Sequence, residues 1–138
     1  MEPSGYADRP DYRVDVRRKR NLVRVTHEGV LLAETTAALV VDEQDHGLVL
    51  YVPRADVRTE HLAPSERTSR CPFKGRARYW RLRDGTDPIA WEYPEPYPEV
   101  AILRDHIAFY QDAAVVRIGS ATPVTSAPRD SGGSGRHG

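Results

Sequence analysis

Short segments with alternating apolar and polar residues make up most of the chain between residues 12 and 118. Val23 and Val25, for example, alternate with polar neighbours, and Glu28-Gly29 then provides a tight turn. Because successive side chains of a strand point to opposite faces of its sheet, this pattern indicates half-buried strands joined by hairpins. It predicts a mainly β (β-rich α+β) fold, a small antiparallel domain of roughly eight strands with one or two short helices.

Turn residues and prolines set the ends of the predicted elements. Asp42–Gly47 separates two short apolar strands, and Pro53 ends the second of them. We expect a single helical turn after Pro53, a short helix over Glu99–Arg104, and a closing hairpin of Ile107–Tyr110 with Ala114–Ile118. The other predicted strands are Val23–Thr26, Val30–Glu34, Ala38–Val41, Leu48–Val52, Ala77–Leu82 and Ile89–Tyr93.

The composition excludes several classes of protein. The 138 residues include 20 Lys and Arg against 20 Asp and Glu, so the formal net charge is zero and we do not expect nucleic acid or an anionic membrane as a partner. The longest apolar runs, Ala37–Val41 and Leu48–Val52, are far too short to span a bilayer. A single cysteine excludes an intrachain disulfide and a cysteine-built zinc site. We expect a soluble, cytoplasmic protein with no metal and no cofactor.

The two ends of the chain differ in composition from its middle. Residues 1–11 are rich in Pro, Gly and charge, which is typical of a flexible arm. Residues 119–138 are dominated by Gly, Ser and Pro and predict a disordered tail, because such a segment cannot bury enough apolar surface to fold. The sequence therefore predicts one folded domain over residues 12–118.

Aromatic residues are concentrated in the second half of this domain. Eight of the eleven lie between Phe73 and Tyr110, and the sole cysteine and a lysine adjoin them in Cys71-Pro-Phe-Lys-Gly75. Aromatic rings supply the core of many small β domains, but the hydroxyl of Tyr and the N–H of Trp need polar partners. This window is the part of the chain in which we expect a functional site.

Several segments in this order and spacing resemble one known family. They are Gly29–Glu34, Tyr51–Val57, Arg67–Cys71, Cys71–Tyr79, Ala90–Pro96 and His106–Tyr110. Together they resemble the domain-of-unknown-function family 427, which is labelled a nucleotidyltransferase domain and is similar to the β-tent folds, small antiparallel sheets that meet at an angle over a groove. The resemblance extends from about Val14 to Ile118.

The resemblance implies a compact β domain whose motif residues line one site. These residues are Cys71, Lys74, Gly75, Tyr79, Trp91, Tyr93 and Tyr110. Nucleotidyl transfer, which the family label suggests, generally needs carboxylates that hold two divalent ions. The acidic segments Asp42–Asp45 and Asp84–Asp87 have the composition of ordinary turns between strands, so the label is the weakest of three functional hypotheses.

Cys71 is the one candidate catalytic residue. An ammonium group three residues away, on Lys74, would favour its thiolate, and a catalytic cysteine also needs a base, for which His106 is the best candidate. Two other interpretations stay open: a ligand-facing thiol that does not react, and a buried cysteine that packs as a small apolar residue while Lys74 pairs with an acid.

Lys74 is the candidate for binding an anionic ligand, a carboxylate or a phosphate, with the tyrosine hydroxyls and Trp91 as the rest of the pocket. The alternative for Lys74 is an ordinary salt bridge at the surface. The leading functional hypothesis is therefore a small-molecule binding site or enzyme pocket. The second is a non-catalytic interaction module that holds a peptide or a partner protein in an aromatic groove.

Overall fold

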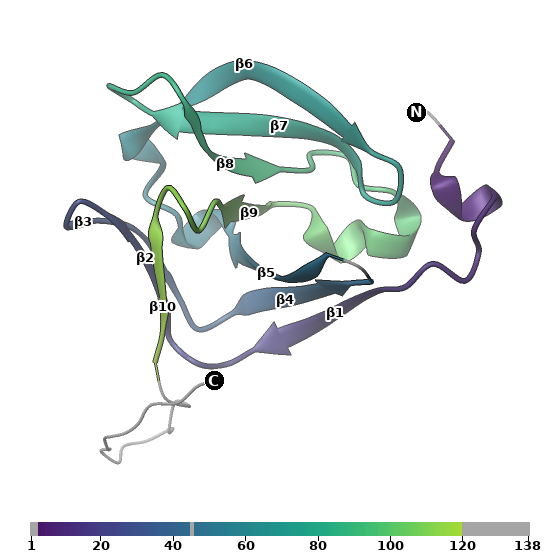
Figure 1. Ribbon diagram of the computed structural model, residues 1–138. Coiled ribbons are helices and arrows are strands. Elements are labelled where there is room, and N and C mark those ends of the chain that lie inside the picture. Colours follow the sequence, from purple (N-terminus) through teal and green to yellow (C-terminus); the bar gives the residue numbers. More distant parts are fainter. Residues whose placement is uncertain (1–2, 45, 120–138) are drawn as a thin grey trace.

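Ten strands form two antiparallel sheets in the part of the chain that the computed structural model describes, residues 3–44 and 46–119 (Figure 1). Seven strands form the larger sheet, in the order β1-β4-β5-β9-β8-β7-β6, and three form the smaller one, in the order β10-β2-β3. The strands are β1 Val14–Lys19, β2 Val23–His27, β3 Val30–Thr35, β4 Ala38–Glu43, β5 Gly47–Pro53, β6 Leu62–Cys71, β7 Gly75–Leu82, β8 Pro88–Glu92, β9 His106–Phe109 and β10 Val115–Ile118. The prediction of a mainly β, antiparallel fold is confirmed.

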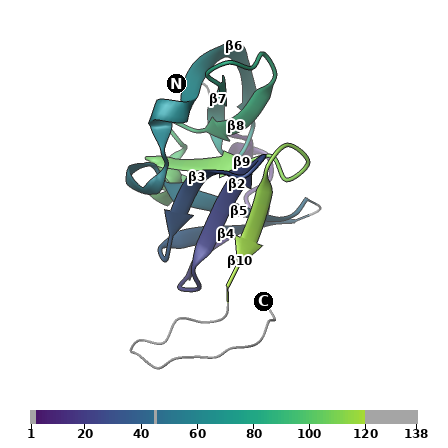
Figure 2. The same cartoon turned by 90° about the vertical axis from the view of Figure 1, so that its left-hand side faces the viewer.

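The smaller sheet lies at one end of the larger one, as the two views in Figures 1 and 2 show. The larger sheet is strongly curved, so that the pair β6–β7 and the strands β1, β4 and β5 stand on opposite sides of its middle strands β8 and β9. One face of the larger sheet is therefore concave, and this concave face carries the candidate site described below.

Hairpins connect most neighbouring strands, and the local sequence explains them. Glu28 and Gly29 have φ angles of +50° and +82°, the left-handed pair that a two-residue turn between twisted strands requires, and His27 pairs with Val30 across that turn. β4 and β5 pair across the second predicted hairpin, with Val41 opposite Val49. Both hairpin predictions are confirmed.

The predicted closing hairpin is wrong. β9 lies in the middle of the larger sheet, between β5 and β8, whereas β10 pairs with β2 in the smaller sheet. The residues between them, Tyr110 to Ala114, form a turn that passes the chain from one sheet to the other. Local pattern identifies a strand but not its partner, which depends on contacts distant in sequence.

The sequence pattern also missed two edge strands. β1 pairs with β4 and contains Arg17-Arg18-Lys19, and β6 pairs with β7 and is exposed over most of its length. An edge strand with polar and charged side chains lacks the regular apolar alternation from which strands are predicted, while its charges discourage pairing with other molecules.

The helices among the described residues are short 3₁₀ turns, listed here in chain order: η1 Gly5–Ala7, η2 Arg54–Asp56, η3 Thr59–His61 and η4 Pro98–Leu103. η2 lies where a single helical turn was predicted, and η4 overlaps the short helix predicted over Glu99–Arg104. None of these helices is long and apolar enough to cross a membrane.

The N-terminal arm and the C-terminal tail were both predicted to lack order. Within the arm, the Gly5 N–H donates a 2.7 Å hydrogen bond to the Pro72 carbonyl oxygen, and the Tyr6 ring meets the Phe73 ring edge to face at 5.0 Å. These contacts place η1 against the turn between β6 and β7. The tail lies outside the described residues except for Gly119.

Two apolar clusters occupy the two faces of the larger sheet. The first lies between the two sheets and contains Val25, Leu32, Val52, Trp80 and Ile107 among others. The second lies on the concave face and contains Leu39, Tyr51, Tyr79, Tyr93 and Leu103 among others. The second cluster is rich in tyrosine and includes partly exposed rings, whereas the first is mainly aliphatic.

Candidate functional site

The concave face carries a row of side chains that crosses five strands. Strand pairing aligns Tyr79 with Trp91, Trp91 with Ala108, and Ala108 with Tyr51, so these residues lie side by side on one face. Leu39 continues the row beside Tyr51. Because β8 and β9 lie at the middle of the curved sheet, the residues of this row come from both walls and from the floor between them.

The rings in this row contact one another. The Trp91 Nε1–H donates a 3.1 Å hydrogen bond to the Tyr51 hydroxyl, which joins the two rings over the small and fully buried Ala108 between them. The Trp91 ring also lies 4.6 Å from the Tyr110 ring, at a tilt of 48°. The Tyr79 and Tyr110 rings are parallel within 7°, with centroids 6.4 Å apart. The result is a continuous aromatic wall, formed by Tyr51, Tyr79, Trp91 and Tyr110.

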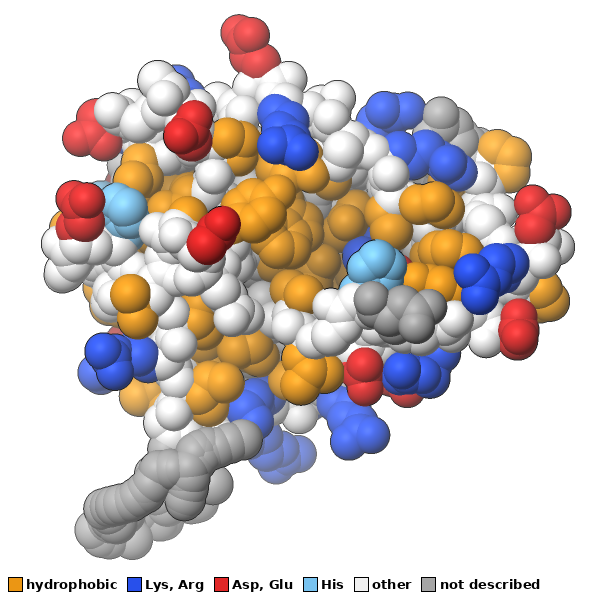
Figure 3. All heavy atoms as spheres, in the orientation of Figure 1, with side chains coloured by type: hydrophobic (Ala, Val, Ile, Leu, Met, Phe, Trp, Pro, Cys, Tyr) orange, Lys and Arg blue, Asp and Glu red, His pale blue; other side chains and the backbone are white. Residues whose placement is uncertain are grey.

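This wall faces a hollow in the molecular surface. Figure 3 shows apolar side chains gathered in a depression between the pair β6–β7 and the strands β4 and β5. Trp91 and Tyr110 are only partly buried, whereas Tyr51 is 1% exposed. The outer rings of the wall are therefore accessible, while Tyr51 supports them from behind.

The rim of the hollow on the β6 side carries three polar side chains, from alternate residues of one strand. The Arg67 guanidinium carbon lies 4.8 Å from the centroid of the Tyr79 ring, the Ser69 hydroxyl lies 2.8 Å from the Tyr79 hydroxyl, and Cys71 packs against the aromatic cluster. Arg67 is exposed, and its side chain has no hydrogen bond or ion pair with the described residues. Its position is set by the cation–π contact alone.

Burial changes the acidity of these tyrosines. Burial is the main cause that raises the pKa of the Tyr93, Tyr51 and Tyr110 hydroxyls, and hydrogen bonding with Tyr79 raises that of Tyr110 further. The hydroxyls are therefore neutral at physiological pH, and they offer hydrogen bonds rather than charge.

Lys74 is buried at the end of this face and is paired. Its ammonium donates to the Glu43 carboxylate, whose other oxygen accepts a 2.6 Å hydrogen bond from the Tyr12 hydroxyl. Lys74 is 7% exposed and Glu43 is 9% exposed, so this is a buried ion pair and not the exposed salt bridge that was the alternative for Lys74. Burial alone would raise the Glu43 pKa, but the hydrogen bonds from Lys74 and Tyr12 outweigh it and hold that pKa below its ordinary value.

The backbone conformation at residue 75 favours glycine. Its φ is +123°, a conformation that other residues rarely adopt, and a Cβ at this position would lie 3.0 Å from the Glu95 carbonyl oxygen. The neighbouring Lys74 carbonyl accepts a 3.1 Å hydrogen bond from the Tyr97 N–H. Gly75 thus permits the segment after β8 to pack against the start of β7.

The predicted site residues therefore divide into two groups. Tyr79, Trp91, Tyr110 and Cys71 lie at or beside the hollow, whereas Lys74, Gly75 and Tyr93 are buried in the packing behind it. The Nδ1 of His106, the candidate base for Cys71, lies 2.9 Å from the Arg104 carbonyl oxygen, and no hydrogen bond or ion pair among the described residues joins it to Cys71.

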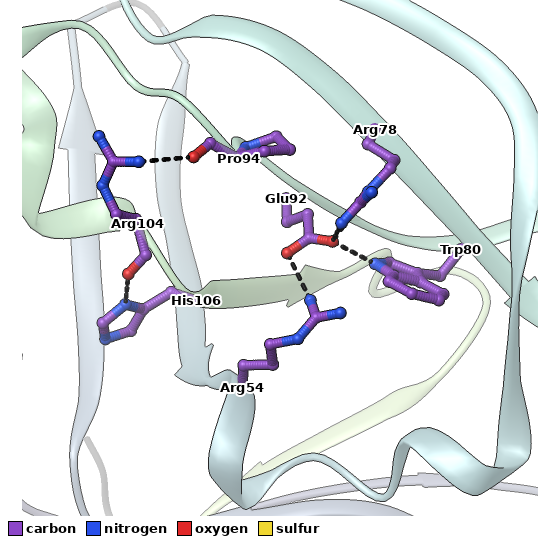
Figure 4. A network of polar contacts seen from close by, with 7 residues as sticks. All are labelled: Arg54, Arg78, Trp80, Glu92, Pro94, Arg104 and His106. Carbon is purple, nitrogen blue, oxygen red and sulfur yellow. Dashed lines mark hydrogen bonds and ion pairs between the residues drawn. The ribbon is translucent and has the colours of Figure 1, made fainter.

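A second polar network on the opposite face was missed from the sequence. Glu92 is 3% exposed and accepts from Arg54 at 2.7 Å, from Arg78 at 2.9 and 3.2 Å, and from the Trp80 Nε1–H at 2.9 Å (Figure 4). Arg54 and Glu92 both belong to segments that carry the family resemblance, Tyr51–Val57 and Ala90–Pro96. Their place in these segments was the one sign in the sequence that both residues belong to a site. Spacing along the chain could not show that the two side chains meet.

Another pocket of the described surface lies beside the β2–β3 hairpin. It has a volume of about 420 Å³ and is lined by His27, Leu32, His61, Leu82 and Asp84 among others. It contains no aromatic ring other than the two imidazoles, and the Glu28 side chain on its rim is 85% exposed. We do not regard it as the candidate site, because none of the residues that the family resemblance implies for the site lines it.

The comparison with protein families agrees with the resemblance of the motifs. A family model described as a domain of unknown function, DUF427, with the label NTP_transf_9, matches residues 15–119. The chain belongs to this family. The match covers both the aromatic hollow and the Glu92 network, since Tyr51–Val57 and Arg67–Tyr110 lie within it. A comparison with curated proteins found no match.

The family model's name carries a nucleotidyltransferase label, and nucleotidyl transfer generally needs carboxylates that hold two divalent ions. No group of three or more His, Cys, Asp or Glu side chains among them is arranged to hold a metal ion. Assignment of function therefore depends on the geometry of the hollow.

Proposed function

We propose that this protein binds a small anionic molecule with a flat ring, which lies against Trp91 and Tyr110 in the hollow. The observation that carries the proposal is the pair of partly exposed aromatic rings, 4.6 Å apart, in an apolar depression of the sheet. Sites for small molecules are usually concave and apolar, with a few polar groups that fix orientation. Ring stacking against Trp and Tyr holds the body of such a ligand.

The positive side chain that pairs with the anionic group of the ligand is Arg67 rather than Lys74. The Lys74 ammonium is already neutralised by Glu43 in a buried pair, whereas the Arg67 side chain is exposed at the rim and has no ion pair with the described residues. A planar guanidinium also suits a carboxylate or phosphate, because it can donate two parallel hydrogen bonds.

The remaining polar groups of the hollow are hydroxyls and one thiol. The Ser69–Tyr79 hydroxyl pair supplies donors and acceptors near Arg67, and Cys71 lies in the same part of the cluster. The proposal is one of binding and includes no reaction at Cys71. We also propose a β-tent arrangement of the two sheets and a cytoplasmic location. The free thiol of Cys71 agrees with a reducing compartment, in which disulfides are rare.

Matched pairs of ligands test the proposal. We would titrate the protein with benzoate, indole-3-acetate and naphthoate, and with the corresponding neutral amides, by isothermal titration calorimetry. We expect the wild type to prefer the carboxylates, because only they pair with Arg67. Arg67→Gln should abolish that preference but leave binding of the amides, while Tyr110→Leu should weaken both.

Arg58→Gln is the matched control, since Arg58 is an exposed arginine outside the hollow. Its binding should equal that of the wild type. The proposal is overturned if none of the six compounds binds, or if Arg67→Gln and Arg58→Gln have the same effect.

A further inference from the structure

A second candidate site lies on the face of the larger sheet opposite the hollow. Because side chains alternate along β8, Glu92 points to the face opposite that of Trp91. There it gathers Arg54, from η2, and Arg78, from β7, around its carboxylate (Figure 4). The network borders the apolar cluster between the two sheets, to which Trp80 belongs.

The network contains more positive charge than its structural role needs. One arginine would neutralise Glu92, but two guanidiniums share this one carboxylate, which leaves one positive charge in excess. The Glu92 side chain is 4% exposed, whereas those of Arg54 and Arg78 are 36% and 48% exposed. The excess charge is therefore presented to solvent, with the compensating carboxylate buried beneath it.

Both guanidiniums are held in place before any ligand arrives. Their central carbons lie 5.2 Å (Arg54) and 5.5 Å (Arg78) from the centroid of the Trp80 ring, and Glu92 fixes each from below. The backbone of Arg54 is anchored as well, because its N–H donates a 2.7 Å hydrogen bond to the Asp105 carbonyl oxygen. Arginines that are already ordered lose little further rotamer freedom when they bind a ligand.

Donor groups remain on both arginines. Arg54 uses only one terminal nitrogen, Nη1, and Arg78 uses Nε and Nη2. Within the described residues, Nε and Nη2 of Arg54 and Nη1 of Arg78 have no hydrogen-bond acceptor.

From this arrangement we infer that Arg54 and Arg78 form a binding site for a phosphate-type oxyanion, with Glu92 as the positioning residue that holds the two guanidiniums apart and oriented. The planar, multiply donating guanidinium is suited to the tetrahedral oxygens of such a group. This site is distinct from the hollow and does not depend on the function proposed for it. The oxyanion is either free phosphate or the phosphoryl group of a small phosphomonoester.

Trp80 provides a reporter for the test. The chain has two tryptophans, so Trp91→Phe leaves Trp80, which both guanidiniums contact, as the single tryptophan. Inorganic phosphate and glycerol 3-phosphate would be titrated into this variant at constant ionic strength, with Trp80 fluorescence as the readout. We expect saturable binding, and the tighter of the two ligands identifies the source of the oxyanion.

Charge variants in the same background separate a built site from general attraction. Arg54→Gln and Arg78→Gln should each weaken phosphate binding roughly tenfold, as expected for the loss of charge-assisted hydrogen bonds. Arg58→Gln removes the same charge from an exposed arginine that belongs to neither site, and it should leave phosphate binding unchanged. Glu92→Gln should weaken binding although it makes the protein more positive, because the guanidiniums lose their anchor; circular dichroism verifies that the variant is folded.

Three results would overturn the inference. They are the absence of saturable binding of either ligand, an equal effect of Arg58→Gln and Arg78→Gln, and tighter binding by folded Glu92→Gln. If Glu92→Gln does not fold, the two arginine variants decide the question, since each keeps one guanidinium on Glu92.

Discussion

Glu43 and Glu92 are two buried carboxylates on opposite faces of the same sheet, and they differ in what surrounds them. Glu43 accepts from one ammonium and one hydroxyl, on Lys74 and Tyr12, and all three side chains are buried. The exposed His46 imidazole lies 3.9 Å from the same carboxylate. Glu92 accepts from two guanidiniums whose side chains are more than one third exposed. In the first network one buried cation balances one buried carboxylate, while the second network is open and carries excess positive charge.

The difference gives a way to distinguish a buried charge network that stabilises the fold from one that can bind a ligand. Burial of an ion pair is costly, and removal of one partner leaves a charge without compensation. A balanced and buried pair such as Lys74–Glu43 therefore holds two hairpins together. Around Glu92, the exposed guanidinium groups offer more hydrogen-bond donors than the carboxylate needs. These ordered donors are therefore available to a ligand. The following predictions test this contrast.

The largest effect is expected at Lys74. Lys74→Met should reduce the free energy of unfolding by about 3–5 kcal/mol, because it leaves the buried Glu43 carboxylate without its cation. Urea denaturation followed by circular dichroism measures this. Lys74→Met combined with Glu43→Leu should recover part of the loss, since the uncompensated charge is then gone. A loss below about 1 kcal/mol for the single variant, the range of exposed pairs, would contradict the assignment.

Acid should weaken the Glu43 network. The pKa of folded Glu43 lies below the ordinary value of 4.5, so its contribution to stability is complete above that pH. As the pH falls below 4.5, the unfolded chain takes up the proton first, and the contribution is lost as the pH passes through the lowered pKa of the folded state. The difference in unfolding free energy between wild type and Glu43→Gln should therefore shrink towards pH 3. A difference that is constant over this range would show that Glu43 does not titrate as described.

A smaller loss is expected at Arg78. Arg78→Gln should lower the free energy of unfolding by roughly 1 kcal/mol, because Glu92 keeps Arg54 and the Trp80 N–H as partners and the Arg78 side chain is half exposed. The measurement is the same urea denaturation. If Arg78→Gln were as destabilising as Lys74→Met, the two networks would not differ in the way that we describe.

Arg67 should contribute least to stability. Arg67→Gln is expected to change the free energy of unfolding by less than about 0.5 kcal/mol, since the side chain is exposed and is held only by its contact with the Tyr79 ring. A thermal unfolding curve that matches the wild type would confirm this. A large loss would show that the contact with Tyr79 stabilises the wall of the hollow rather than serving a ligand.

The sequence alone determined the class of fold and the region of the hollow. Alternating residues and turn residues act locally, so the hairpins β2–β3 and β4–β5 followed from them. The concentration of Tyr and Trp after Phe73 likewise located the aromatic wall, because a tyrosine or tryptophan needs both apolar contacts and a polar partner. The family resemblance extended this to Tyr79, Trp91 and Tyr110.

Tertiary structure decided what each charged side chain does. Lys74 and Glu43 are 31 residues apart, and Arg54 and Glu92 are 38 apart, so no local pattern joins them. Whether a lysine binds a ligand or a buried carboxylate depends on which strands the sheet brings together, and that order is fixed by contacts distant in sequence. For the same reason β9 was assigned to the wrong partner, since its neighbours β5 and β8 are chosen by the packing of two whole faces and not by its own four residues.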